Sequence, residues 1–231
     1  MLIDELKYGK TNFNKEDIFM MDTLFKNFEI LKGIKKVNGY ANLENMVNDY
    51  KNKLDNIFIK SDGHLGDRIL EAIGENPYQR TIDLSFGEYY NLIWNVDKLK
   101  KIINENKIKK RPFLLTGLID VVDENGINKF ALENASKNKK PIIVGYFPQL
   151  NPHYIVIDGN HRVMSRYQRH KKIIMGYEIS PQYLAKGLAG EIFKNLFIMH
   201  LNMHAVLTYI VGEINEKQLN AKIIPVINNM Y

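Results

Sequence analysis

Hydrophobic residues recur every three or four positions through the first third of the chain. Between Lys15 and Leu31, and again between Leu43 and Phe58, this spacing places apolar side chains on one face, which is typical of helices packed against a core. A turn-rich stretch, Lys60–Gly66, comes next, and a short helix is expected over Asp67–Ile73. The sequence therefore predicts a helical N-terminal segment over residues 1–76.

After Pro77 the pattern changes to short apolar runs separated by turns. The expected strands are Arg80–Ser85, Pro141–Phe147, Tyr154–Ile157, Ile173–Ile179 and Lys222–Val226. The expected helices are Asn95–Asn106, Asn128–Lys137, Asn160–Lys171, Pro181–Phe197 and Met199–Val211. Phe113–Val122 is compatible with a strand or a buried helix. The fold class is therefore α/β or α+β, with a small mixed sheet and C-terminal helices forming one domain over residues 77–231.

One short stretch combines a strand, a glycine turn and a helix start. The apolar run Tyr154–Ile157 leads into Asp158-Gly-Asn-His-Arg162, and the helix follows directly. Gly159 can adopt a positive φ and lets the backbone approach a ligand closely. The amides of the first helical turn have no partner within the helix and lie at the positive end of its dipole. This arrangement predicts a phosphate-binding site.

The side chains of this stretch add chemistry to the amides. Gly159, Asn160, His161 and Arg162 are predicted to hold nucleotide phosphates, with Arg162 supplying a forked pair of donors. His161 can donate a hydrogen bond or carry a proton during catalysis. Asp158 can cap the helix, bind Mg²⁺ or act as a base. The simpler alternative is a tight turn in which Asp158 caps the helix and Arg162 forms a surface salt bridge.

Residues from about 80 to 180 resemble the ParB/sulfiredoxin superfamily. The matching pieces are Thr81–Leu84, the helix before Lys139, Pro141–Val144 and Tyr154–Arg162. The form Asp-Gly-X-His-Arg is most similar to ParB-like nucleotide-binding members and to members resembling free serine kinases. The resemblance implies a sheet of the ParB/sulfiredoxin type whose glycine motif binds nucleotide phosphates.

Two departures from that family narrow the expected activity. Sulfiredoxins carry their catalytic cysteine where this chain has Asn160, and the chain contains no cysteine, so that chemistry is excluded. Chromosome-partitioning members have Gly-Glu-Arg-Arg where this chain has Gly159–Arg162, and they continue into a helix-turn-helix. The serine-kinase-like members use an acidic residue after the first strand, and Glu88 lies in about that place. The alternative is that Glu88 is an exposed carboxylate in a loop. The expected function is an NTP-dependent phosphotransferase or NTPase that uses ATP or another NTP with Mg²⁺.

The charge of the chain also favours anionic partners. The net charge is +6 and the pI about 9.2. Basic side chains that can contact nucleic acid are Lys109, Lys110, Arg111, Arg166 and Arg169. The alternative function is therefore a DNA-associated ParB-like protein or nuclease of a mobile element or phage. A solvated basic helix face is the simpler account of these residues.

The most apolar segment, Ile192–Val211, is interrupted by polar residues such as Lys194 and Asn202. It is expected to be a buried helix, and the protein is expected to be cytoplasmic with no membrane partner. His200 and His204 share one face of this helix, a spacing that zinc sites use. The zinc-protease motif also requires a glutamate directly after the first histidine, and Leu201 stands there, so the motif is not met.

Overall fold

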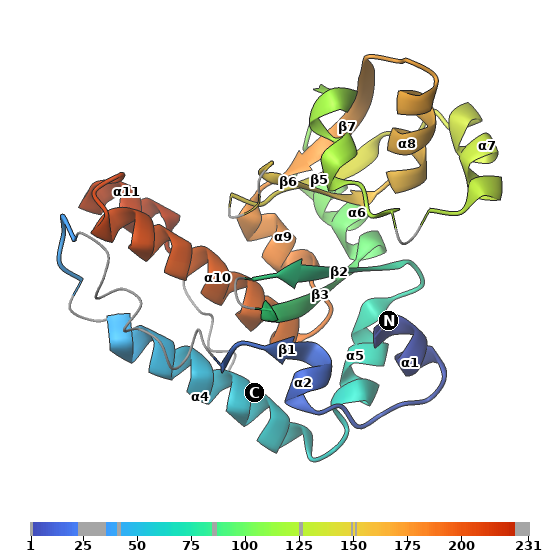
Figure 1. The fold of residues 1–231 in the computed structure, drawn as a ribbon. Coiled ribbons are helices and arrows are strands. Elements are labelled where there is room, and N and C mark those ends of the chain that lie inside the picture. The colour runs from blue at the N-terminus through green and yellow to red at the C-terminus, as the bar shows by residue number, and fades with distance from the viewer. Residues whose placement is uncertain are drawn as a thin grey trace. The chain divides into compact units, whose positions relative to one another are not determined.

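The computed structural model describes residues 2–22, 36–40, 43–84, 87–124, 127–148, 150 and 152–224. It confirms an α+β fold with two small sheets (Figure 1). The chain divides into two compact units. Unit 1 contains Met1–Ile73, Gln79–Ile93 and Leu188–Tyr231, and unit 2 contains Gly74–Tyr78 and Trp94–Gly187.

Unit 1 is mostly helical. Its helices are α1 (Leu2–Lys7), α2 (Lys15–Ile18), α4 (Leu43–Ser61), α5 (Leu65–Ile73), α10 (Glu191–Ile210) and α11 (Glu216–Lys222). The long helix α10 packs along α4 and against α11 (Figure 1). Most of the α10 side chains are buried, which explains its almost uniformly apolar sequence. Among the described helices, none has the length and apolar character needed to cross a membrane.

A three-stranded sheet in the order β1-β3-β2 belongs mainly to unit 1. Its strands are β1 (Phe19–Met20), β2 (Pro77–Asp83) and β3 (Tyr89–Asn95), and β2 and β3 also reach into unit 2. The predicted helix Lys15–Leu31 is wrong at Phe19–Met20, because these two residues pair antiparallel with β3. Residues 23–31 of that prediction lie outside the described residues. Strand β3 was not predicted from the sequence.

Unit 2 contains the second sheet, in the order β4-β7-β5-β6. Its strands are β4 (Lys110–Leu114), β5 (Ile142–Tyr146), β6 (Tyr154–Asp158) and β7 (Ile173–Ile179), and its helices are α6 (Val96–Glu105), α7 (Lys129–Lys137), α8 (Asn160–Gln168) and α9 (Pro181–Gly187). Two 3-10 turns, η3 (Leu115–Gly117) and η4 (Ile119–Val121), follow β4. The sheet is mixed because β5 pairs parallel with β7 and antiparallel with β6.

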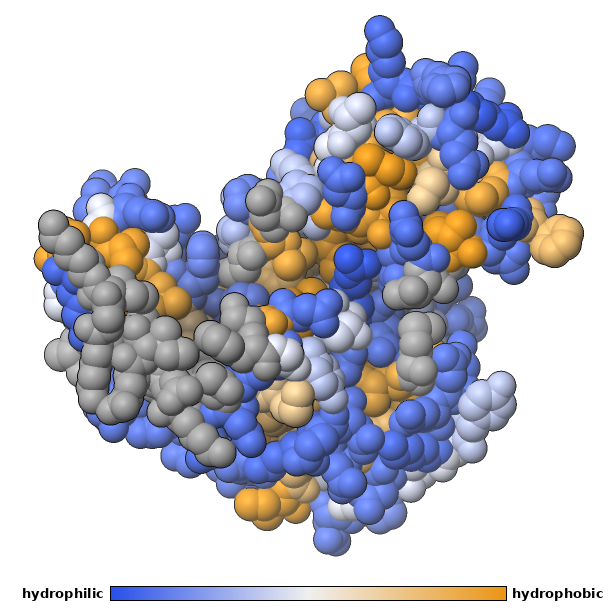
Figure 2. Space-filling view, in the orientation of Figure 1, coloured by the Kyte–Doolittle hydropathy of each residue, from blue (hydrophilic) through white to orange (hydrophobic). Residues whose placement is uncertain are grey.

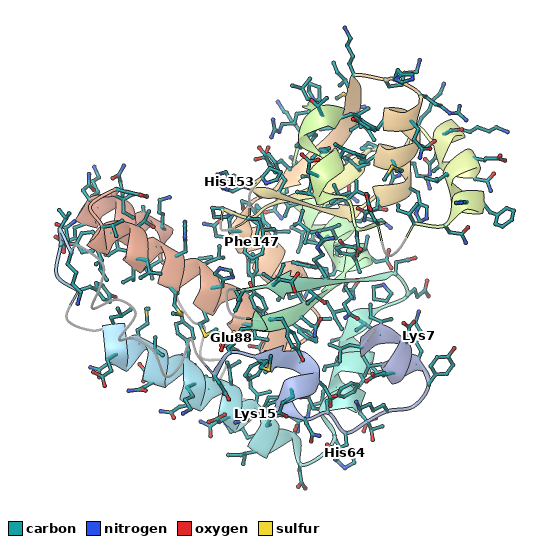
Figure 3. All side chains as sticks on the ribbon, in the orientation of Figure 1. Lys7, Lys15, His64, Glu88, Phe147 and His153 are labelled. Atoms are coloured by element: carbon teal, nitrogen blue, oxygen red, sulfur yellow. The ribbon has the colours of Figure 1, made fainter. Side chains whose placement is uncertain are left out.

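The core of unit 2 lies between this sheet and α8. Val144, Val156 and Val163 are fully buried within it, together with side chains from β4, β7 and the two 3-10 turns. The β5–β6 hairpin is closed by the Phe147 amide, which donates to the His153 carbonyl at 2.8 Å (Figure 3). Packing of α8 onto β5 and β6 therefore fixes the position of the glycine turn.

Several predicted elements are confirmed within one to three residues, including α4, α6, α7, β5, β6 and β7. The predicted break between Pro181–Phe197 and Met199–Val211 is wrong, because α10 runs unbroken and the chain instead bends at Gly190, whose φ is 97°. Phe113–Val122 was expected to be a strand or a buried helix, and neither describes the whole segment. It begins with the end of β4 and continues as two 3-10 turns. The predicted strand Lys222–Val226 is wrong at Lys222, which ends α11; residues 225 and 226 lie outside the described residues.

The division into units differs from the predicted boundary between residues 76 and 77. One junction does fall close to that point, but the C-terminal helices group with the N-terminal segment. The reason is the burial requirement of α10, whose apolar sides are covered by α4 and α11.

Figure 2 shows a mainly hydrophilic visible surface with separate hydrophobic patches.

Candidate functional site

The predicted strand, glycine turn and helix are all present in unit 2. Strand β6 ends at Asp158, and α8 begins at Asn160. Between them Gly159 has φ 108° and ψ 21°, a left-handed conformation that favours glycine. A Cβ atom built at Gly159 would also lie 2.4 Å from Cγ2 of Ile142. Glycine is therefore needed both for the turn and for the close packing of the turn on β5.

Three amides at the start of α8 have no hydrogen-bond acceptor among the residues that the structure describes. The first amide of the helix with an internal partner is that of Val163, which donates to the Gly159 carbonyl at 2.9 Å. Across the part of the chain that the structure describes, no group accepts a hydrogen bond from the amides of Asn160, His161 or Arg162. Amides in this position, at the positive end of a helix dipole, can donate to an anion.

The Arg162 guanidinium is directed at protein acceptors. Its Nη1 donates to the carbonyls of Lys140 and Pro141 at 2.6 and 2.8 Å, and its Nη2 lies 2.8 Å from Oδ1 of Asp158. The side chain is only 8% exposed. Through its three bonds, Arg162 links the start of β5 to the end of β6. To bind a phosphate with both of its donor groups, Arg162 would have to exchange these bonds for bonds to the phosphate. The simpler alternative foresaw a salt bridge of Arg162 at the surface; the ion pair is present, but its arginine is buried.

Asn160 and His161 also make contacts within unit 2. The Asn160 side chain accepts from the Asp123 amide at 3.2 Å and donates to the Val156 carbonyl at 3.0 Å. His161 accepts a hydrogen bond at Nε2 from the Asn128 amide at 3.0 Å. With Nε2 as the acceptor, the ring proton of this arrangement is on Nδ1. That N–H is the group His161 can offer to a ligand.

An open hollow of about 320 Å³ lies beside the glycine turn. Asp158, Gly159, His161 and Arg162 line one side of it. The opposite side is formed by helix α7, through Ala131, Asn134, Ala135 and Asn138. The volume is within the range of small-molecule sites. Sequence reasoning missed the α7 residues, although their spacing of three, four and seven positions indicates a single helical face.

Glu88 differs from the other predicted catalytic residues in its position. It lies in unit 1, immediately before β3 (Figure 3), whereas Asp158 and His161 lie in unit 2. Its side chain is buried, so the alternative of an exposed loop carboxylate is wrong. Its backbone carbonyl accepts from the Leu84 amide at 2.8 Å, which closes the β2–β3 connection.

The basic residues proposed for nucleic-acid contact fall into two groups. Arg111 pairs with Glu178, lies 4.3 Å over the Phe113 ring and donates to the Tyr154 hydroxyl, so it forms part of the packing of the sheet. Arg166 donates to the Asn138 carbonyl at 3.2 Å. Lys109, Lys110 and Arg169 are exposed. Nucleic-acid binding by this set stays a prediction.

Metal-binding residues are sparse. Among the described residues, no three histidine, aspartate or glutamate side chains come together as a metal site. Asp158 is the single carboxylate lining the hollow, and it already pairs with Arg162. These donors do not fit a resident Mg²⁺; an ion here would have to come with the phosphates of its ligand.

The chain was compared with protein-family models, with curated proteins and with solved structures, and none of the three comparisons gives a match.

Proposed function

We propose that unit 2 binds the phosphates of a nucleotide at the start of α8, as the first step of nucleotide hydrolysis or phosphoryl transfer. The observation that carries the proposal is the set of three amides, of Asn160, His161 and Arg162, that have no acceptor among the described residues. They stand at the N-terminus of a nine-residue helix beside a hollow of about 320 Å³. Amides without an acceptor among the described residues, together with the helix dipole, favour a dianionic group at this place.

The Asp158–Arg162 pair gives the hollow its electrostatic character. An unpaired carboxylate would repel a phosphate, but the guanidinium of Arg162 neutralises Asp158 at 2.8 Å. In this proposal Arg162 is a positioning residue: it orients the Asp158 carboxylate and stabilises the glycine turn, and it does not bind the phosphate itself. The other carboxylate oxygen of Asp158 can orient a water or an acceptor hydroxyl, and the Nδ1–H of His161 can donate to a phosphate oxygen.

The proposal is tested by nucleotide binding to the whole chain. Thermal shift and calorimetry with ATP, ADP, CTP and GTP, each with and without Mg²⁺, identify the ligand; at 100 times Kd a bound ligand adds about 2.7 kcal/mol of stability. Ala131→Glu introduces a charge into the hollow without altering the glycine motif. Phe130→Glu is the matched control, because Phe130 is the adjacent position on α7, is exposed and does not line the hollow.

We expect Ala131→Glu to weaken nucleotide binding at least tenfold and Phe130→Glu to leave it unchanged. Absence of binding by all four nucleotides would overturn the proposal, and so would equal effects of the two variants. Hydrolysis is then measured with the nucleotide that binds.

A further inference from the structure

Unit 1 contains a second hollow, separate from the start of α8. One side is a face of α10 formed by Met199, His200, Met203, His204 and Leu207. The other side is formed by the residues that follow β1 and β2, namely Met21 and Leu84, and by Tyr90 from β3. Its volume is about 130 Å³. Four separate segments of the chain therefore line one small, mainly apolar hollow.

Two polar groups of this hollow, from Tyr90 and His200, are paired with each other, whereas the third polar residue, His204, is exposed. Tyr90 is fully buried, and its hydroxyl lies 2.6 Å from Nδ1 of His200. The two rings also meet edge to face, with centroids 5.6 Å apart. Because the phenol is hydrogen-bonded to the imidazole, most of the remaining lining is formed by methionine and leucine side chains.

The buried pair of Tyr90 and His200 is also uncharged at neutral pH. Burial, with a smaller contribution from the nearby His204, lowers the pKa of His200 to about 4. Burial raises the pKa of the Tyr90 hydroxyl well above its ordinary value. A charged ligand would lose its hydration on entry without gaining an opposite charge from this pair.

We propose that this hollow binds one small, uncharged, apolar molecule about the size of a single aromatic ring. Apolar cavities of about 150 Å³ in other proteins take up benzene, so the volume here suits one ring. Three of the lining residues are methionines, whose flexible thioethers adapt to the shape of an occupant and contact aromatic rings favourably. This site does not depend on the proposed nucleotide site, which lies in unit 2.

Toluene and benzoate test the proposal as a pair, since they have similar shapes and differ in charge. The intact protein is labelled at its methionine methyl groups and titrated with each compound by NMR. We expect saturable toluene binding that shifts the methyl signals of Met199 and Met203, with the half-exposed Met20 as an internal control that does not move. Benzoate is expected to bind at least tenfold more weakly.

Leu207→Trp is designed to fill the hollow, and Thr208→Trp places the same side chain on the next residue of α10, outside the lining. We expect only Leu207→Trp to abolish toluene binding. The proposal is overturned if folded wild-type protein shows no saturable toluene binding, if benzoate binds as tightly, or if the two variants bind toluene equally. The wild-type methyl titration decides the matter even if Leu207→Trp fails to fold.

Discussion

The Arg162 guanidinium and the Asp158 carboxylate are four residues apart and form an ion pair, with Nη2 2.8 Å from Oδ1. The arginine lies on the first turn of α8 and the aspartate at the last position of β6. Two further bonds from Arg162 reach the carbonyls of Lys140 and Pro141, just before β5. One buried side chain thus connects the ends of two strands and a helix around the glycine turn.

Arg162→Ala is expected to lower the free energy of unfolding by about 2–3 kcal/mol, because the change leaves a partly buried carboxylate and two carbonyls without their donor. Arg169→Ala is the control, since Arg169 is the exposed C-cap residue of the same helix and its loss should change stability by less than about 0.5 kcal/mol. Urea unfolding measures both. Equal midpoints for the two variants would contradict the structural part assigned to Arg162.

Gly159→Ala is expected to destabilise the protein by about 3 kcal/mol. The new Cβ is strained at φ 108° and lies 2.4 Å from Ile142 Cγ2, so backbone strain and overpacking both contribute. Gly63→Ala isolates the first contribution, because Gly63 has φ 77° but nothing within 4 Å of its Cβ position, and a loss of about 1 kcal/mol is expected there.

The steric part of the Gly159 effect can be checked by a double-mutant cycle with Ile142→Ala. If the methyl contact is responsible, the alanine at position 142 removes it, and the two losses in unfolding free energy should sum to more than the loss in the double variant. Strict additivity would show that the contact with β5 is not the source of the cost.

The glycine turn was predictable from sequence because its causes are local. An apolar β run, a glycine and a helix start occupy consecutive positions, and each acts through its own backbone. The partners of Arg162 were less accessible, since two of them, the carbonyls of Lys140 and Pro141, lie more than twenty positions away. A forked donor next to free amides is equally compatible with a phosphate and with protein carbonyls, and only the fold decides between them.

Strand β3 and the pairing of Phe19 and Met20 were missed for a similar reason. The run Tyr89–Asn95 has buried residues at consecutive positions, so it lacks the alternation that identifies a strand. Phe19 and Met20 fit the helical spacing of their neighbours, and pairing with Tyr90 and Tyr89 overrides that local preference. In both cases the deciding contacts join segments about seventy residues apart.

Stability is expected to fall as the pH decreases from about 6.5 to about 4, because of His200. Burial lowers the pKa of His200 from 6.5 to about 4 in the folded protein, so in this window the unfolded chain binds a proton that the folded chain does not. Stability therefore rises with pH across the window, and the full effect of this one group is about 3 kcal/mol.

His200→Gln should remove that part of the pH dependence, whereas His64→Gln removes an exposed histidine and serves as the control. Urea unfolding at half-unit steps between pH 4 and pH 7 compares the slopes. A His200→Gln slope identical to that of the wild type would show that His200 is not the buried neutral group responsible.

His161→Ala is expected to loosen the start of α7. The imidazole accepts from the amide of Asn128, and Asn128 in turn caps the helix by accepting from the Phe130 amide at 2.9 Å. Removing the acceptor should cost about 1 kcal/mol locally, which corresponds to roughly fivefold faster hydrogen exchange over Lys129–Lys137. Asn134→Ala is the control, because Asn134 lines the same hollow but makes no contact with Asn128 among the described residues. Exchange across α7 that is unchanged in His161→Ala, or accelerated equally in Asn134→Ala, would show that the imidazole does not hold this helix against α8.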